Sequence, residues 1–324
     1  MSQVLQKLVI ALTDGSLYAL IALGYTMVYG VLRLINFAHG DVFMIGAFIG
    51  AYTAQFLSAA LGHTAEADQA WWMAPLGIAA AMAVCGCVGF TIERVAYRPL
   101  RNAPKLSALI TAIGVSLLIE YLLQMKWVFG KHEFFGPNPL AYPKIDGSGR
   151  AIAWMHDLFG ISVVPKDLIV LGTTAAALVL VQVFVRYSRM GKAMRAVSIS
   201  YDSARLMGIN INAVISFTFV LGSMLAALGG CLWGLNSGQC VPLMGIIPGL
   251  KAFVAAVIGG IGNIPGAAAG AFLLAIIETV VTSITINHSA VAAPYKDAVA
   301  FLILILVLLI RPEGIFGKAV PEKV

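Results

Sequence analysis

The 324-residue chain has 21 Lys and Arg residues and 15 Asp and Glu residues, so 11% of it is charged, against about 25% in soluble domains. Hydrophobic residues make up 60% of the sequence, and its mean hydropathy is +0.91. A soluble chain of this length cannot cover that much apolar surface, and the same figures exclude intrinsic disorder. The composition predicts an integral membrane protein.

A helix needs about 20 apolar residues to cross a bilayer. Eight runs of this kind predict an all-α, polytopic membrane helical bundle, and the nearly continuous apolar sequence of residues 8–60 allows up to ten spans. The eight runs are residues 8–29, 36–60, 71–92, 106–125, 168–186, 213–236, 266–286 and 295–311. A further run, 251–262, is too short to cross unaided. We expect residues 1–324 to form one transmembrane domain.

The basic residues predict which loops face the cytoplasm. Nine of the 21 lie in residues 93–105 and 186–205, each between apolar runs. This is typical of cytoplasmic loops under the positive-inside rule and not of a nucleic-acid-binding face. Residues 126–167 lie between the two basic loops with one span on each side, so we expect an irregular external loop rich in Pro and Gly. The tail from Arg311 is expected to be cytoplasmic.

The four cysteines, Cys85, Cys87, Cys231 and Cys240, lack CxxC and zinc-ligand spacing, and we expect all four to be buried thiols. No metal site is predicted. The sequence also lacks the G-x-x-x-x-G-K-[S/T] pattern of an ATP-binding loop.

Polar residues open the second apolar run. Asn36, His39 and Asp41 lie together there with Gly40. One interpretation is an ordinary helix start, with Asn36 as the cap and Asp41 favoured by the helix dipole. The other is a broken helix, near 33–41, that borders a translocation pathway, because irregular backbone at membrane depth must face protein or a water-filled cavity. The two interpretations are compatible.

A second interruption lies near 251–266. Gly259, Gly260, Gly262 and Gly266, with Pro265, cannot lie in a straight helix without a penalty of several kcal/mol. An ordinary tight loop is possible, but the preceding apolar segment is too short to cross, which favours a half-helix or re-entrant element. We expect Gly259, Gly260 and Gly262, together with Glu278, to border the translocation pathway.

Isolated acids are the third feature. Glu278 lies in the middle of a predicted span, so its side chain must face the bundle interior or a cavity. Glu278, Asp14, Glu120 and Asp297 are scattered along the sequence. Proton-driven carriers usually have a relay of acids and His within the spans, so this scatter weakly disfavours such a carrier.

The predicted cytoplasmic segment 189–209 has an apolar stripe at helical spacing, with basic residues on another face. Either it lies on anionic headgroups as an interfacial helix, or its stripe docks into a partner subunit. The stripe consists of Met190, Met194, Val197, Tyr201 and Ala204, and the basic line of Arg189, Lys192 and Arg195.

Several motifs carry a family resemblance. Residues 202–209, with Asp202, Ser203, Ala204 and Gly208, resemble the E-A-A-x-x-x-G signature of ABC importer permeases. Further matches occur in order along the chain, and the chain is similar throughout to the branched-chain amino acid permease family, closest to the first of its two permease subunits. These matches are residues 24–30, 35–40, 93–99, 186–191, 259–266 and 311–314.

The resemblance implies a transport subunit, not an enzyme, in a bacterial inner membrane. It implies a second homologous permease subunit, two ATP-binding subunits that hold ATP and Mg and dock on the cytoplasmic coupling loop 187–212 (Arg195, Asp202, Ser203, Ala204, Gly208), and a periplasmic substrate-binding protein. Alternating access would move small, mostly apolar amino acids. The alternatives are an ABC permease for urea or short amides, or an ATP-independent secondary carrier, motivated by the broken segments and Glu278.

Overall fold

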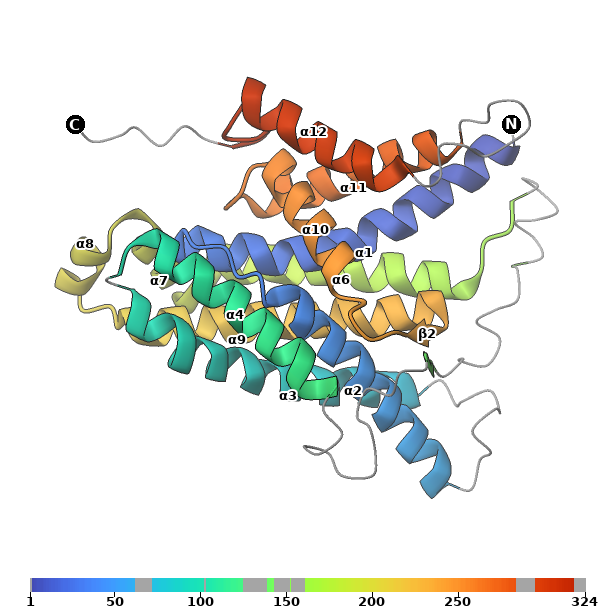
Figure 1. Ribbon diagram of the computed structural model, residues 1–324, viewed down its shortest axis with the longest axis horizontal. Coiled ribbons are helices and arrows are strands. Elements are labelled where there is room, and N and C mark those ends of the chain that lie inside the picture. The colour runs from blue at the N-terminus through green and yellow to red at the C-terminus, as the bar shows by residue number, and fades with distance from the viewer. Residues whose placement is uncertain are drawn as a thin grey trace.

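The computed structural model describes residues 2–61, 72–101, 103–124, 139–142, 152, 161–283 and 295–317. Most of these residues lie in helices that follow one long axis (Figure 1). Seven helices of the described chain are long and apolar enough to cross a bilayer, which confirms a polytopic all-α bundle. They are α1 (Ser2–Leu32), α2 (His39–Ala60), α3 (Met73–Ile92), α4 (Lys105–Gln124), α6 (Pro165–Tyr187), α9 (Ile211–Ser237) and α11 (Ile264–Thr282).

Shorter elements complete the bundle. They are the π-helical turn η1 (Glu93–Tyr97), the 3-10 turn η2 (Arg98–Leu100), α7 (Arg189–Ile199), α8 (Tyr201–Leu206), α10 (Ile246–Gly259), α12 (Lys296–Ile310), β1 (Leu140–Ala141) and β2 (Gln239–Cys240). The two strands pair antiparallel, with Leu140 opposite Cys240. The eighth predicted span is α12, whose 15 residues rise only about 22 Å.

The bundle has two distinct ends. At one end, here called the basic end, Arg33 donates to the Ser198 carbonyl (3.3 Å) and Asn263 donates to the Phe316 carbonyl (3.0 Å). The other end, here called the strand end, holds the β1–β2 pair, and there Gln6 donates to the Ser162 carbonyl (3.1 Å). Figure 1 shows α8 and β2 at these opposite ends. Among the described residues, seven helices are long enough to span the membrane, and the shorter α10 and α12 lie beside them.

The interruption near 251–266 is a short helix followed by a tight turn. α10 has 14 residues, about 21 Å, which is too short for a hydrocarbon core of about 30 Å. Non-helical residues 241–245 lead into it from β2 at the strand end. The expected half-helix is confirmed, but it begins at Ile246, five residues before the apolar run used to predict it.

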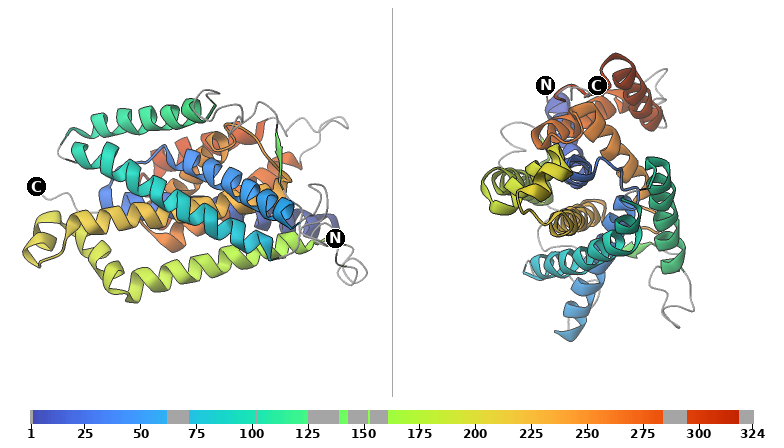
Figure 2. Two further views of the ribbon diagram at one scale, coloured as in Figure 1. Left: turned by 90° about the horizontal axis from the view of Figure 1, so that it is seen from below. Right: turned by 90° about the vertical axis from the view of Figure 1, so that its left-hand side faces the viewer.

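Small residues let the central helices approach closely. An added Cβ on Gly46 of α2 would collide with Ala227 of α9, and one on Gly270 of α11 would collide with the α10 backbone at Ala255. Close helix packing through small residues is the usual solution inside a membrane. The helices α4 and α12 lie at the periphery (Figure 2), and among the described residues of α12 only Ala300 is buried.

Two sequence predictions need comment here. The expected external loop 126–167 is described only at residues 139–142, 152 and 161–167, and the rest of it lies outside the described residues. The expectation that all four cysteines are buried was wrong for one, because Cys87 is exposed on α3 while Cys85, Cys231 and Cys240 are buried. Cys87 lies two positions from Cys85 and so points to another face of the helix.

Candidate functional site

The main chain between α1 and α2 is irregular at membrane depth. α1 ends at Leu32 near the basic end, yet the His39 ring that opens α2 contacts the backbone of Gly24 so closely that a Cβ there would collide with it. Gly24 lies eight residues before Leu32, about 12 Å along the helix axis. Residues 33–38 therefore run back into the bundle without helical structure, which confirms the broken segment predicted near 33–41.

Asn36 does not cap α2, contrary to one of the two sequence interpretations. The N-cap is Ala38, without a side-chain cap hydrogen bond, and the Asn36 backbone carbonyl accepts from the His39 N–H (3.1 Å). The Asn36 side-chain oxygen instead accepts a hydrogen bond of 3.0 Å from the hydroxyl of Tyr97 in η1. The hydrogen-bond partner of this buried amide thus comes from η1, which lies far away in the sequence and which no local pattern at Asn36 reveals.

The first turn of α2 packs directly on α10. A Cβ on Gly40 would lie 2.6 Å from the Gly245 carbonyl oxygen, so the two backbones touch at this point. The His39 ring lies 4.6 Å from that of Tyr25, and the Phe253 ring of α10 lies 6.2 Å from Tyr25. Two interrupted elements of the chain, the start of α2 and the short α10, thus meet inside the bundle.

Asp41 faces α4. Its carboxyl group interacts with the side chains of Ser116 and Glu120, which both lie in α4, and the sequence analysis did not pair α2 with α4. Asp41 and Glu120 are both buried. The acids are scattered along the sequence, but these two are neighbours in space.

A second charged cluster forms around Lys251, which is only 2% exposed. Its ammonium group lies 2.9 Å from the Glu278 carboxylate of α11 and 2.6 Å from Asp297 of α12. The Tyr18 hydroxyl of α1 donates to Glu278 (3.0 Å). Glu278 faces the bundle interior as predicted, and the sequence analysis missed Lys251 and Tyr18. A lone lysine in an apolar run requires a counter-charge, and this requirement would have identified Lys251 as a candidate site residue.

The glycine-rich turn lies apart from both clusters, at the basic end. Gly260 (φ +98°) and Gly262 (φ +94°) adopt left-handed conformations, and the Asn263 side chain caps α11 by accepting from the Gly266 N–H (3.4 Å). The tail binds this turn, because the Ile315 N–H donates to the Ile258 carbonyl (2.8 Å) and the Phe316 N–H to that of Gly259 (3.3 Å). The predicted pathway residues thus fall into three separate groups.

The segment predicted as one helix over 189–209 is two helices, α7 and α8, with Ser200 between them. The Ser200 hydroxyl caps α8 by accepting from the Ser203 N–H (3.3 Å). The predicted stripe is confirmed as an apolar face, since Met194, Val197 and Ala204 are buried. The chain's own bundle covers it, and the Tyr201 hydroxyl reaches the Val31 carbonyl (3.0 Å). The stripe is therefore not a free docking surface.

The outer tip of the two helices is apolar and uncovered. Ile199 is 81% exposed, Leu206 88% and Met207 81%. Gly208 ends α8 in the left-handed conformation (φ +76°), and the Ile209 N–H donates to the Ala204 carbonyl (3.0 Å), which is a Schellman cap. Asp202 and Ser203 are exposed beside the tip. The Arg195 guanidinium donates to the carbonyls of Val185 and Arg186, which ties α7 to the end of α6.

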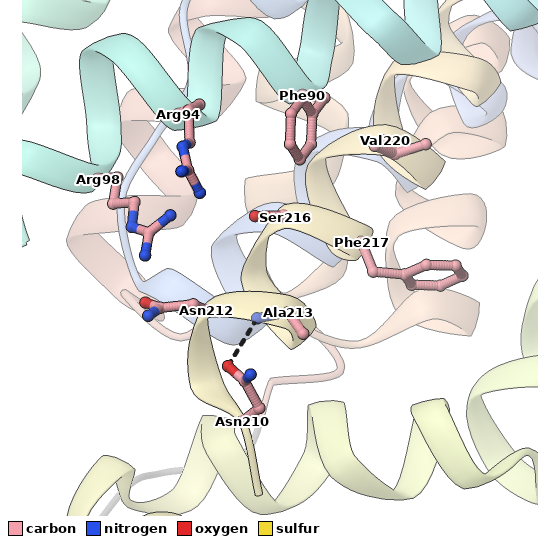
Figure 3. Close-up of a pocket in the computed structure, with 9 residues that line it drawn as sticks. All are labelled: Phe90, Arg94, Arg98, Asn210, Asn212, Ala213, Ser216, Phe217 and Val220. Atoms are coloured by element: carbon pink, nitrogen blue, oxygen red, sulfur yellow. Dashed lines mark hydrogen bonds between the residues drawn. The ribbon is translucent and has the colours of Figure 1, made fainter.

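A pocket of about 500 Å³, with both polar and apolar lining residues, lies between the end of α3 and the start of α9 (Figure 3). The Arg94 and Arg98 side chains point into it from the α3 side, opposite Asn212 and Ser216 of α9. The sequence analysis missed this pocket, although it named the basic loop that contributes its arginines.

A polytopic helical bundle with interrupted helices and buried charged residues is typical of membrane transport proteins. Residues 8–308 match the family described as branched-chain amino acid transport system, permease component, and the chain belongs to that family. It is 39% identical over 320 residues to the high-affinity branched-chain amino acid transport system permease protein LivH of Escherichia coli, covering 99% of this chain and 97% of the relative.

A second relative and one solved structure are also similar to this chain. The chain is 41% identical over 322 residues to the high-affinity branched-chain amino acid permease protein BraD of Pseudomonas aeruginosa, covering 99% of this chain and 98% of the relative. The solved structure of PsaBC from Streptococcus pneumoniae in complex with Fab has a TM-score of 0.44 and 14% identity, with 94% of this chain and 91% of that chain covered.

Proposed function

We propose that this chain is the membrane permease subunit of an ABC importer that moves branched-chain amino acids across a bacterial inner membrane. Near-full-length identity of 39–41% to relatives named for that transport supports the substrate class. The observation that carries the assignment in the structure is the apolar tip of Ile199, Leu206 and Met207 next to Gly208. An exposed apolar patch with a polar rim is typical of a protein interface.

In this proposal an ATP-binding subunit docks on the tip, while the buried stripe connects the tip to the permease. Arg195 holds α7 against the last carbonyls of α6, and Tyr201 bonds the end of α1. A displacement of the tip therefore moves α6 and α1 together, as rigid elements that rock about an interface. Asp202, Ser203 and Ala204 belong to the same coupling loop, which spans 187–212.

The remaining partners follow from the same scheme. A second homologous permease subunit completes the pathway, two ATP-binding subunits hold ATP and Mg, and a periplasmic binding protein delivers the amino acid. The basic end, with the tail from Arg311, faces the cytoplasm under the positive-inside rule. α1 then starts on the periplasmic side. Asn36, His39 and Asp41 border the pathway, and Gly259, Gly260 and Gly262 form a turn at its cytoplasmic end.

The test is Gly208→Arg, with Gly238→Arg as a matched control. Both glycines have φ +76° and open space around an added Cβ, so both variants carry the same backbone cost of about 1–2 kcal/mol. Gly208 lies at the proposed ATPase surface and Gly238 at the strand end. We expect Gly208→Arg to abolish leucine uptake and permease-stimulated ATPase activity in the reconstituted complex, while Gly238→Arg retains both.

Normal coupled transport in Gly208→Arg would overturn the docking assignment.

A second experiment, with the chain alone in liposomes, distinguishes an ABC permease from a secondary carrier. We expect no leucine flux under an ion gradient without ATPase subunits, and sustained flux there would favour the carrier. Urea transport by the complete complex, with leucine excluded, would instead move the chain to the amide-importing class.

A further inference from the structure

We propose that the pocket between α3 and α9 binds the phosphate headgroup of an anionic phospholipid, with the start of an acyl chain along its apolar end. The pocket holds about 500 Å³ and is lined from both helices (Figure 3). This site is separate from the α8 tip and from the buried clusters around Asp41 and Lys251.

The charge in the pocket calls for an anion. Neither Arg94 nor Arg98 has an ion pair or hydrogen bond within the described part of the chain, and both guanidinium groups point into the pocket. The acid next to Arg94 in the sequence, Glu93, is fully buried and already paired with Arg101, and its second oxygen accepts from the Ser216 hydroxyl (2.6 Å). Two cations thus face the pocket without a counter-charge, and guanidinium groups bind phosphate oxygens in a bidentate manner.

Asn212 contributes its side-chain NH₂ to the pocket, because the amide oxygen is already bonded to Arg101. Its side-chain oxygen accepts a hydrogen bond of 2.5 Å from Arg101, which can only donate. The amide NH₂ of Asn212 is therefore the group left for a ligand in the pocket. The Ser216 hydroxyl donates to Glu93, so its proton is already used. The Asn210 side-chain oxygen likewise accepts from the Ala213 N–H (3.2 Å), so the donors available to a ligand are two guanidinium groups and two amides.

Polarity changes along the pocket in the way that a phospholipid requires. On the α3 side the lining runs from Phe90 to Arg94 to Arg98, and on the α9 side from Val220 and Phe217 to Asn212. Eight residues of helix cover about 12 Å, and both walls become polar in the same direction, toward the basic end. Anionic headgroups lie at that level of the bilayer, and basic pockets between helices on the cytoplasmic side bind them.

The apolar end distinguishes a lipid from a small anion. Phe90 is 45% exposed, so the pocket can be reached from the flank of α3. A free phosphate would use these polar donors but leave Phe90, Phe217 and Val220 against water. An acyl chain would cover them, at roughly 25 cal/mol for each Å² of apolar surface removed from water.

The experiment is native mass spectrometry of the purified full chain in neutral detergent, titrated with phosphatidylglycerol or phosphatidylcholine of identical acyl chains. We expect selective binding of phosphatidylglycerol. Arg94→Gln with Arg98→Gln should weaken it by at least about tenfold, since charge-assisted phosphate contacts are lost. The matched control, Arg189→Gln with Lys192→Gln, removes the same charge from the exposed face of α7 and should change the affinity by less than about twofold.

Two further arms keep the outcome unambiguous. Arg94→Lys with Arg98→Lys keeps the charge but loses the planar fork, so we expect intermediate affinity, and this variant serves if the double glutamine variant does not fold. Inorganic phosphate should not displace the lipid at equal concentration. Equal binding of the two lipids, unchanged binding in the glutamine variant, or displacement by phosphate at equal concentration would each overturn the lipid assignment. Because no ATPase subunit is present, failure here leaves the transport proposal intact.

Discussion

The Lys251 ammonium group of α10 lies 2.9 Å from the Glu278 carboxylate of α11, and both side chains are buried. Each charge is expensive inside a membrane, and each makes the other tolerable. With Asp297 and Tyr18 the pair joins α1, α10, α11 and α12. These contacts therefore hold the short helix α10 against α1, α11 and α12.

Removing one partner of this pair should be costly. We expect Lys251→Met to lower the free energy of unfolding by about 3–5 kcal/mol, because it leaves the buried Glu278 carboxylate without a counter-charge. Lys296→Met, at an exposed lysine of α12, should change it by no more than about 0.5 kcal/mol. Thermal unfolding in detergent measures both. Adding Glu278→Gln to Lys251→Met should recover part of the loss, and equal stability of Lys251→Met and the native chain would contradict the role of the pair.

The α8 tip should matter for assembly and not for folding. Leu206→Asp with Met207→Asp changes two side chains that are more than 80% exposed, so we expect no measurable loss of thermal stability. We expect the same variant to lose co-purification with the ATP-binding subunits. Met194→Ala is the reverse case, because Met194 is buried in the stripe, and it should cost about 2–5 kcal/mol. Retained co-purification of the tip variant would place the interface elsewhere.

The contact between α2 and α10 leaves no room for a methyl group. In Gly40→Ala the new Cβ would lie 2.6 Å from the Gly245 carbonyl oxygen, so the helices must separate, and we expect lower thermal stability and reduced uptake. Gly114→Ala is the matched control, since nothing lies within 4 Å of an added Cβ at that position in α4. It should gain about 0.5–1 kcal/mol from lower chain entropy in the unfolded state. Equal melting temperatures would contradict the close approach.

Cys240 at the strand end should resist alkylation. Burial raises the pKa of its thiol to about 12, so at pH 8 only about one molecule in 10,000 carries the reactive thiolate. We expect maleimide to label this position slowly in the folded protein and rapidly after denaturation. The variant Ser237→Cys, at an exposed position of the same end, provides the fast reference. For the assay the other cysteines are replaced by Ala, and equal rates at the two positions would show that Cys240 is accessible.

Sequence reasoning predicted the features that depend on length and local pattern. The spans follow from hydropathy, and the buried face of Met194 and Val197 follows from helical spacing. The break at Ser200 was missed, although a serine followed by Asp202 in the first turn is a recognisable helix start. What covers a stripe cannot be predicted from its period, so the choice between headgroups, a partner and the chain's own bundle required the structure.

The remaining differences are tertiary. Asn36 is a typical capping residue, but its side chain bonds Tyr97 because residues 33–38 run back along α1. Asp41 and Glu120 are far apart in the sequence and meet only because α4 packs beside α2. The same holds for the pocket at Arg94 and Arg98, whose second wall comes from α9.

The bond between the tail and the turn after α10 also sets an order of events during synthesis. The carbonyls of Ile258 and Gly259 accept from residues 315 and 316, which are made 57 residues later. At about 5–20 residues per second this interval is roughly 3–11 s. During that time α11 and α12 are still being synthesised, and the turn between α10 and α11 lacks two of its backbone bonds. Closure of the bundle at this corner is therefore a late step of biogenesis, completed only when α12 and its tail arrive.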